Sequence, residues 1–496
     1  MVFFSLNRWS RAVGGVRRLE RRHGRTVDTL KMLCRVLLLA FAPILEAASS
    51  RLTATCSITD HGAVPGNATA DARRNAAAVQ AALAACSTVT VPRGVFKLAP
   101  VSLPSFSTLS LDAGAVLAGS DDWRDYLPAI HFMPPLGNSG TQPNMLQLTP
   151  LLSARFAVNV TITGANGTID GTGWFAWPSA NWSSPACGMH GACAGPTYFG
   201  APPMRPPHLL SFTHCAFTTL SNVTFQNPAY WGVQHFFSND TAVRGVTILA
   251  PRWTREIAGF MPFSVQRYRV FDSYVRVGDD AVAIMSGPDW ADPAGCTASS
   301  PCAVANTSWP TAGVSFTRLF VTGRSVAIGS EDFGNVTDVA FDGCTIGDDE
   351  GSAPWAFKIK MHSNVGCRVS GVVVRNTKLG RISGNTWQDP VGGTALFMQL
   401  AYNDPPINAS RPQPTLENVS FVNVTATSCV HAGDFAGGLH LISGLRFENC
   451  AFRATSAAPW RLKGVDTASC SSFNTTPAFP APAAAPLAAP VARAGP

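Results

Sequence analysis

Apolar and polar residues alternate along most of this chain from about residue 88 onward. Val89-Thr-Val91 and Val95-Phe-Lys-Leu98 each place an apolar residue at nearly every second position, and the turn Pro92-Arg93-Gly94 separates them. Successive side chains of a strand point to opposite faces, so this alternation predicts short β-strands that each bury one face. The chain is therefore expected to be all-β after this point.

One segment before these strands has a different period. Residues 71–86 carry apolar side chains three or four positions apart, at Ala72, Ala76, Val79 and Leu83. This spacing places the four on one face of a helix, and Asp71 is suited to cap its N-terminus. The pattern predicts a single short helix.

A strand phrase recurs from about residue 155, with an apolar residue, a turn-forming Asn, Gly or Asp two positions later, and further apolar residues behind it. Its copies are Leu220–Phe225, Val243–Ile248, Val336–Phe341, Val369–Val374, Leu416–Phe421 and Ile442–Phe447. The first two copies start 23 residues apart and the last two 26 residues apart, a period typical of a solenoid. Each copy can bury its apolar face only by stacking on its neighbours, which predicts a parallel β-helix whose open end is closed by the helix at 71–86. A β-sandwich is the competing fold, but hairpin turns at closer spacing would be expected for it.

The overall charge does not indicate a nucleic-acid partner. The chain of 496 residues has a formal net charge of +7, but residues 1–48 hold nine Lys/Arg and three acids, so the remainder carries only about +1. Charged residues make up 14%, with 43 Gly and 37 Pro, which fits many short strands and turns.

The two ends of the chain differ from the repeats in composition. Residues 36–42 are apolar, follow a basic stretch and precede small residues, which predicts a secretory signal over 1–48 with cleavage near Ala48; translation from Met32 would leave a shorter signal of the same kind. The apolar run is too short to span a bilayer. Residues 475–496 are mostly Ala and Pro and are expected to be disordered or extended. One domain is therefore expected over 49–474, with no membrane attachment after signal removal.

Cysteines and sequons agree with export. Twelve cysteines remain once Cys34 leaves with the leader, an even number suited to disulfides in an oxidising compartment. Cys187/Cys193 and Cys296/Cys302 are close enough to clip single loops, and Cys344 and Cys367 are spaced like neighbours on successive coils, although spacing leaves the connectivity open. Twelve Asn-x-Ser/Thr sequons suit a glycosylated surface: Asn67, Asn159, Asn166, Asn181, Asn222, Asn239, Asn306, Asn335, Asn408, Asn418, Asn423 and Asn474.

Two adjacent carboxylates interrupt an apolar strand pattern in Val277–Gly287. Hydrolysis of a glycosidic bond needs one carboxylic acid to protonate the leaving oxygen and one carboxylate to activate water, and Asp279-Asp280 on a rigid strand could present both to one cleft. An Asp pair alone is weak evidence, because turns favour Asp; Asp348-Asp349 in this chain is expected to be a solvated turn of that kind.

Six ordered phrases between Cys56 and Cys470 carry a resemblance to a known family. They are Ile58–Val64, Gly167–Gly171, Val243–Arg252, Gly278–Ile284, Ala327–Glu331 and Phe357–Lys360. The chain resembles the polygalacturonase family of glycoside hydrolases, in its plant-like branch. The resemblance implies a right-handed parallel β-helix that acts on pectic polysaccharides by inversion, with Asp279 as general acid and Asp280 as the base that holds the attacking water.

The family's third catalytic carboxylate is missing from its expected place. An Asn-Thr-Asp-Gly segment of the family aligns without gaps to Glu256-Ile257-Ala258-Gly259, so Ala258 stands where the aspartate is expected. Residues 256 and 258 of a strand point the same way, and Glu256 could reach the same water from one position earlier. The alternative is a catalytically impaired relative that only binds glycan, because an activated water contributes about a hundred- to ten-thousand-fold.

The substrate-binding residues show similar changes. The Arg-Ile-Lys of the family becomes Lys358-Ile359-Lys360, which could meet a uronate carboxylate without the bidentate grip of an arginine. Arg324 replaces a histidine of the family and is a further candidate, as is Gln234 on the floor of the cleft. The tyrosine of the family near Arg368 is absent, which puts a preference for plain galacturonan in doubt.

The sequence thus predicts a secreted, monomeric hydrolase of a pectin-like or other acidic cell-wall polysaccharide. The histidines show no zinc spacing, no glycine loop cradles a phosphate, and no clustered acids indicate calcium, so no metal or cofactor is expected. A structural coat or matrix protein is a third possibility, but it would not need the paired carboxylates.

Overall fold

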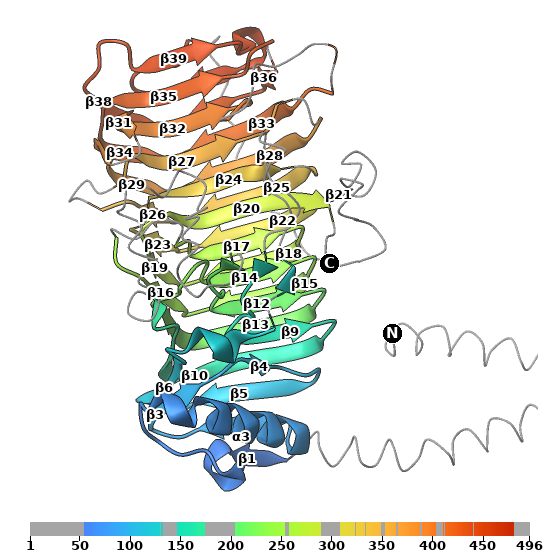
Figure 1. Ribbon diagram of the computed structural model, residues 1–496. Coiled ribbons are helices and arrows are strands. Elements are labelled where there is room, and N and C mark those ends of the chain that lie inside the picture. The colour runs from blue at the N-terminus through green and yellow to red at the C-terminus, as the bar shows by residue number, and fades with distance from the viewer. Residues whose placement is uncertain are drawn as a thin grey trace, which may run out of the picture.

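Parallel strands stacked coil upon coil form the body of the molecule (Figure 1). The computed structural model describes residues 54–480 apart from 129, 132–145, 174–203, 253–256, 289–307, 323, 333, 349–352, 364–365, 387–388, 403–409, 411 and 440. The expected leader, Glu256, and the cysteines at 187, 193, 296 and 302 lie outside the described residues. The fold is a right-handed parallel β-helix, as predicted, and the sandwich alternative is wrong.

Most of the described strands belong to one of two sheets. One sheet, here called the site sheet, has β20 near its middle, and β21 pairs with β20 antiparallel. Its strands are β4 (Val101–Ser102), β9 (Leu152–Arg155), β12 (Leu210–Thr213), β14 (Val233–Phe236), β17 (Phe260–Phe263), β20 (Asp280–Pro288), β21 (Ser308–Trp309), β24 (Ser325–Asp332), β27 (Trp355–Lys360), β32 (Thr394–Gln399), β35 (His431–Ala436) and β39 (Trp460–Lys463).

The second sheet, here called the long sheet, continues around the coil. Its strands are β1 (Thr55–Ser57), β2 (Thr88–Val91), β3 (Gly94–Leu98), β5 (Ser107–Leu111), β6 (Ala115–Gly119), β10 (Val158–Asp170), β13 (Ala216–Gln226), β15 (Asn239–Arg244), β16 (Thr247–Leu249), β18 (Gln266–Phe271), β19 (Tyr274–Arg276), β22 (Thr311–Thr317), β23 (Phe320–Val321), β25 (Val336–Asp342), β26 (Thr345–Ile346), β28 (Arg368–Arg375), β29 (Lys378–Arg381), β33 (Thr415–Val422), β34 (Thr425–Cys429), β36 (Ile442–Ser443), β37 (Arg446–Glu448), β38 (Ala451–Ala454) and β40 (Ser471–Phe473).

Short elements complete the described structure. Two small sheets contain β7 (Ile130–His131), β8 (Leu146–Gln147) and β11 (Met204–Arg205), and β30 (Gly384–Thr386) with β31 (Asp389–Gly392). The helical elements are η1 (Ile58–His61), η2 (Thr69–Asp71), α3 (Ala72–Ala85), η3 (Trp123–Tyr126) and η5 (Thr467–Ser469). None of the described helices has the length and apolarity needed to cross a membrane.

The recurring phrase occupies two different bends of the coil. Leu220 pairs with Val243, and Val336 pairs with Val369, so copies on successive coils stack in register as expected. In the first two copies, however, the first apolar residue aligns with the last apolar residue of the later copies. The register runs from Val243 to Val270, from Val270 to Phe316, and from Phe316 to Phe341. The same bend chemistry, a residue with positive φ between two buried apolar residues, is therefore used twice per coil.

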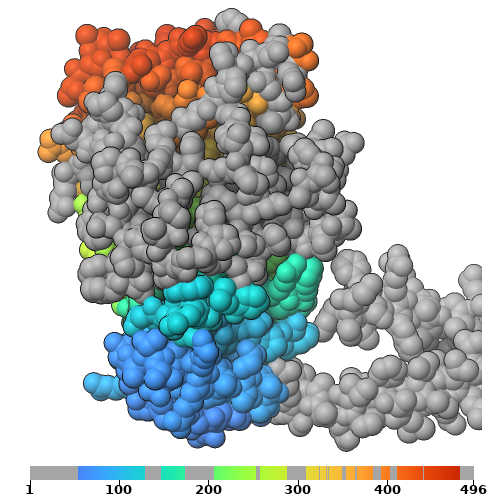
Figure 2. All heavy atoms as spheres, in the orientation of Figure 1, coloured from blue at the N-terminus to red at the C-terminus, as the bar shows by residue number. Residues whose placement is uncertain are grey.

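The helix α3 lies across the N-terminal end of the stack, as Figures 1 and 2 show in blue. Ala72, Ala76, Val79 and Leu83 are buried, which confirms the predicted face. Asp71 occupies the N-cap position, but its side chain makes no capping hydrogen bond, so its predicted role is wrong. Apolar burial, at about 25 cal/mol per Å², holds this helix in place.

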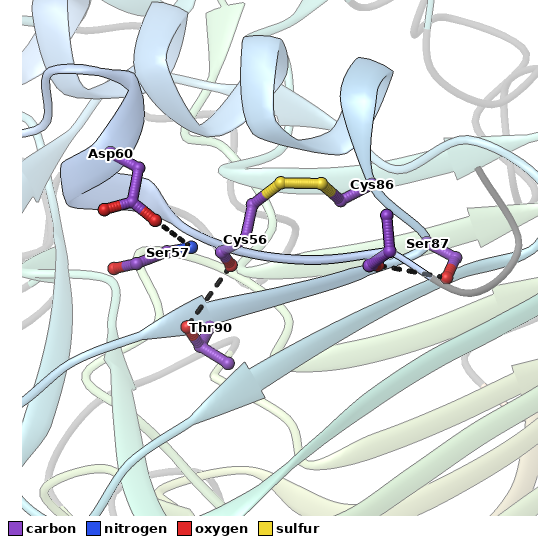
Figure 3. Close-up of a disulfide and its surroundings, with 7 residues drawn as sticks. Cys56, Ser57, Asp60, Cys86, Ser87 and Thr90 are labelled. Atoms are coloured by element: carbon purple, nitrogen blue, oxygen red, sulfur yellow. Dashed lines mark hydrogen bonds between the residues drawn. A yellow bond between two sulfur atoms is a disulfide. The ribbon is translucent and has the colours of Figure 1, made fainter. Parts of the chain in front are cut away.

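A disulfide joins Cys56 in β1 to Cys86 at the end of α3 (Figure 3). The Thr90 hydroxyl donates to the Cys56 carbonyl at 3.2 Å, and the backbone amide of Ser57 donates to the Asp60 carboxylate at 3.0 Å. Cys344, in contrast, keeps a buried thiol that donates to two backbone carbonyls, so its expected disulfide is not formed.

The C-terminal end is closed by residues that were expected to belong to the tail. Phe479 is buried, and its ring lies 4.7 Å from that of Phe447 and 5.0 Å from that of Trp460. The Trp460 indole donates to the Pro477 carbonyl at 3.2 Å. The boundary predicted at Thr475 therefore lies too early, because the first residues of the Ala/Pro segment cover the last coil.

Candidate active site

The candidate active site begins where β20 enters the site sheet. The Asp279 amide donates to the Ile257 carbonyl at 3.2 Å, and the Gly259 amide donates to the Asp280 carbonyl at 3.0 Å. These bonds tie the acid pair to the coil below it. The Asp280 amide also donates to the Asp279 carboxylate at 2.8 Å, which fixes one side chain against the backbone of the other.

The Asp280 carboxylate is surrounded by donors from two other coils. Lys358 Nζ lies 2.9 Å from Oδ1, Lys360 Nζ lies 2.8 Å from Oδ2, and the Ser325 hydroxyl donates to Oδ1. Both lysines lie on one face of β27 because they are two positions apart. Lys358 pairs across the sheet with Ala327, whose small side chain leaves room for the lysine to extend toward Asp280.

Asp280 is held as an anion. Burial by itself would raise its pKa, but the charges of Lys358, Lys360 and Arg324 and the hydrogen bond from Lys360 outweigh burial and hold the pKa of this carboxyl far below its usual range. An anion that gives up its proton so readily is a weak base. It is better suited to orienting a water than to taking its proton.

The cations of the site lie against aromatic rings. The Arg324 guanidinium lies 4.8 Å from the centre of the Trp355 ring and 3.6 Å from the Asp279 carboxylate. Lys358 Nζ lies 4.6 Å from the same ring, and Lys360 Nζ lies 5.4 Å from the Tyr402 ring. Such cation–π contacts contribute about 0.5–2 kcal/mol each.

Lys358 is the cation that burial affects most. Its side chain is 2% exposed. Burial lowers the pKa of Lys358 most strongly, Asp280 raises it, Lys360 and Arg324 lower it again, and the result is a pKa of about 7. Below that pH Lys358 adds its charge to those of Lys360 and Arg324, and this group of three cations is suited to an anionic sugar.

Three residues of this site had not been singled out from the sequence. Ser325 directly follows Arg324, in a phrase that departs from the family pattern, and its hydroxyl binds Asp280. Trp355 lies three positions before Lys358, and Tyr402 lies 42 positions after Lys360. Neither spacing indicates that these residues share a site. The site thus contains a tyrosine, Tyr402, but this residue comes from a different segment than the family resemblance implies.

Ala258 lies on the coil directly beneath the acid pair, and its surroundings are apolar. It belongs to a buried cluster with Tyr230, Trp231, Phe236, Phe237, Met261, Phe263, Ala283 and Met285. No carboxylate among the described residues stands at this position, and Glu256 lies outside them. The lower side of the site therefore differs in polarity from the upper side, where the lysines lie.

The structure does not bring Gln234 to the acid pair. Gln234 is buried in β14 and pairs with Met261 of β17, which places it two coils below β20. Coils are about 4.8 Å apart, so about 10 Å separates their backbones. Asp348 is not the solvated turn residue expected, because Arg252 donates to its carboxylate.

No group of three or more His, Cys, Asp or Glu within the described part of the chain is arranged to hold a metal ion. The arrangement of two carboxylates, three cations and two aromatic rings instead matches the needs of acid–base chemistry on an anionic, ring-shaped substrate.

Comparison with known proteins identifies the family. The sequence model described as "Glycosyl hydrolases family 28" matches residues 84–432, well over half of the chain. The chain belongs to glycosyl hydrolases family 28. This confirms the family resemblance seen in the sequence.

Curated relatives match the family 28 chain over part of their length. A probable polygalacturonase of Vitis vinifera is 33% identical over 199 residues, which are 40% of this chain and 37% of the relative. An exo-poly-alpha-D-galacturonosidase of Dickeya chrysanthemi is 38% identical over 125 residues, 24% of this chain and 19% of the relative. The matched part thus spans well under half of each relative.

Solved structures share the fold of the family 28 chain. The exopolygalacturonase of Yersinia enterocolitica gives a TM-score of 0.64 at 18% identity, covering 85% of this chain and 75% of that one. The exopolygalacturonase of Thermotoga maritima gives 0.60 at 17%, covering 81% and 87%. The polygalacturonase of Erwinia carotovora gives 0.59 at 20%, covering 83% and 96%.

Proposed function

We propose that this protein hydrolyses glycosidic bonds in a pectin-like or other acidic polysaccharide, with inversion at the anomeric carbon. The observation that carries the proposal is the Asp279–Asp280 pair at the start of β20, enclosed by Lys358, Lys360 and Arg324. Family membership and the polygalacturonase relatives support it.

Asp279 is the proton donor in this proposal. Of the two carboxylates it is the less enclosed, with 16% of its side chain exposed against 8% for Asp280. A carboxylic acid near the surface of the site can protonate the oxygen of the leaving sugar. Arg324, 3.6 Å away, would stabilise the Asp279 carboxylate that remains after the proton has left.

Asp280 positions the attacking water. A carboxylate has about four acceptor positions, and Lys358, Lys360 and Ser325 take three of those on Asp280, so about one remains for a water. Because its low pKa makes Asp280 a weak base, a second carboxylate is needed to accept the proton. Glu256 is the proposed acceptor, since it directly precedes Ile257, whose carbonyl binds the Asp279 amide.

The cations select the substrate. A uronate carboxylate near the scissile bond would meet Lys360 and Lys358, whose charges exceed what Asp280 alone balances. Gln234 has no part in this contact in our proposal, because it lies two coils away. We further propose that the chain is secreted through its N-terminal signal, acts outside the cell or in the cell wall, and is a monomer.

One observation favours a second function, glycan binding without turnover. The methyl group of Ala258 lies in an apolar cluster where a water-activating carboxylate is expected. If Glu256 does not compensate, the lysines and rings can still hold a polysaccharide while no group accepts the proton of the water.

Reducing-sugar release from a panel of uronans and neutral glycans tests both functions. The parent protein is compared with Asp279→Asn and Glu256→Gln, and polysaccharide binding is measured in parallel by calorimetry. Cleavage of a uronan by the parent that both substitutions abolish supports the hydrolase with Glu256 as base. Loss with Asp279→Asn alone leaves Asp280 as the only base. Binding without cleavage by the parent would overturn the hydrolase in favour of the binding protein.

A further inference from the structure

A column of residues with positive φ follows one bend of the long sheet through ten successive coils. The strand registers align Phe106, Asn159, Phe217, Asp240, Arg267, Gly313, Asp338, Gly371, Asn418 and Gly444, with φ between 55° and 69°. Gly, Asn and Asp adopt this conformation at low cost, whereas a bulky side chain is strained in it. We call these residues the bend column.

Two phenylalanines of the bend column adopt this strained conformation and are also exposed to solvent. Phe106 is 43% exposed and Phe217 is 58% exposed. Arg267 is bulky too, but its guanidinium binds the carboxylate of Asp240 on the neighbouring coil at 2.6 and 2.8 Å. The two phenyl rings therefore stand out as strained, apolar and facing solvent, a combination that indicates a partner.

The two rings flank one residue. Val160 pairs with Ser107 on one side and Thr218 on the other, so Asn159 lies between Phe106 and Phe217 with about 4.8 Å to each neighbouring coil. Asn159 is itself exposed and has φ 57°. Any group attached to its side chain must pass between or over these two rings.

A third exposed ring stands close by in the sequence. Phe156, three residues before Asn159, has φ 52° and is 63% exposed. Its ring stacks on His214 with 4.9 Å between ring centres, and the Arg155 guanidinium lies 5.2 Å from its centre. These contacts hold the ring in one place, at the bend that precedes Asn159.

Asn159-Val160-Thr161 is an N-glycosylation sequon. We propose that Asn159 carries an N-linked glycan whose first sugar rings lie on Phe106 and Phe217. One face of a pyranose carries only C–H groups and matches the face of a phenyl ring, so the glycan removes apolar surface from water. The glycan is thereby an integral cover of this bend.

The attachment follows ordinary sequon chemistry and requires a lipid-linked oligosaccharide diphosphate as donor. The side-chain amide nitrogen of Asn159 loses a proton and forms a bond to the anomeric carbon of the first N-acetylglucosamine. The bond from that carbon to the lipid diphosphate oxygen breaks, and the lipid diphosphate leaves with the bonding electrons and takes up the proton that the amide lost. No oxidation or reduction takes place.

Asn418 provides a matched control within the same column. It is an exposed sequon asparagine with φ 55°, but its neighbours on the adjacent coils are Gly371 and Gly444. A glycan at Asn418 meets the same backbone conformation, and the two neighbouring residues of the bend column carry no ring. Differences between glycans at the two positions therefore report on the rings.

The test uses the full chain expressed in a host that performs N-glycosylation, with site occupancy measured by glycopeptide mass spectrometry. We expect Asn159 to be occupied. An amidase should release its glycan from the native protein about tenfold more slowly than the glycan of Asn418, because contact with the two rings holds the first sugars against the protein; a tenfold ratio corresponds to about 1.4 kcal/mol. Phe106→Gly with Phe217→Gly, which relieves the backbone strain, should make the two rates equal.

Three results would overturn the proposal. The first is an unoccupied Asn159 in protein whose Asn418 is occupied. The second is equal release rates in the parent protein, which needs no variant and so does not depend on how the double substitution folds. The third is a parent protein that carries no glycan at Asn159, together with binding of a free polysaccharide to the rings of Asn159→Gln. The rings would then bind an external polymer and not the protein's own glycan.

Discussion

Replacing Lys358 by methionine should make the protein more stable near neutral pH and leave it nearly unchanged in alkaline solution. Methionine keeps the length of the lysine stem on the Trp355 ring and removes the charge. Asp280 retains Lys360 and Ser325 as partners, so the substitution does not leave that carboxylate without a counter-charge.

The magnitude follows from the pKa of Lys358. In the folded protein it is about 7, against 10.5 for an unperturbed lysine, so the unfolded chain binds more protons between these two values and stability rises with pH in that window. The charged lysine therefore costs the folded state most below pH 7. Between about pH 6.5 and 9.5 this difference corresponds to about 3 kcal/mol of unfolding free energy.

Urea unfolding of the parent and Lys358→Met at these two pH values measures the effect. The difference in unfolding free energy between the two proteins should shrink by about 3 kcal/mol on going to the higher pH. Titrating groups that do not interact with Lys358 contribute equally to both proteins and cancel. Lys463→Met, at an exposed position of β39, is the matched control. A difference that is the same at both pH values would refute the argument that burial destabilises the charged form of Lys358.

Three further outcomes are expected. Lys358→Arg should keep its charge above pH 7, so the alkaline loss of kcat/KM that we expect for the parent should move to higher pH; an unchanged pH profile of uronan cleavage would contradict a role for this charge. Phe479→Ala should lower the unfolding free energy by about 3–5 kcal/mol, because it removes a buried ring from the C-terminal end; a loss below about 1 kcal/mol in urea unfolding would mean that the end does not need this cover. Cys56→Ser with Cys86→Ser should cost about 3–4 kcal/mol, because the disulfide closes a loop of 30 residues; the midpoint of thermal unfolding with and without reductant checks it, and a parent insensitive to the reductant would contradict it.

Local pattern was enough to predict the repeating architecture. Each copy of the strand phrase buries its apolar residues only when it stacks on another copy, and the spacings of 23 residues between the first two copies and 26 between the last two equal the length of one coil at those places. The face of α3 followed in the same way from helical spacing. The acid pair at Asp279 and Asp280 could be found because glycoside hydrolysis requires two carboxylates and because the phrase around them resembles family 28.

Local pattern failed where a residue's role depends on a distant coil. Asp71 sits at the N-cap, yet its side chain makes no capping bond, and Phe479 lies in a segment whose composition indicates disorder but packs on Phe447. Asp71 ends the 3-10 turn η2 and has helical backbone angles, in place of the extended ones of a capping residue, whereas at Phe479 tertiary contacts outweighed local preference. Gln234 had a suitable side chain but lies two coils from the acids, a distance that only the stacking order of the strands determines.

The sequence by itself determined the solenoid, its capping helix, its family and the presence of two adjacent carboxylates, because each of these is encoded by residues near one another in the chain. Only the tertiary structure decided what surrounds those carboxylates. Ser325, Lys358 and Lys360 lie 45 to 80 residues from Asp280, and the stacking of β20, β24 and β27 brings them into contact. Burial and neighbouring charge act through space, so the shifts that lower the pKa of Asp280 and the pKa of Lys358 exist only in the folded chain.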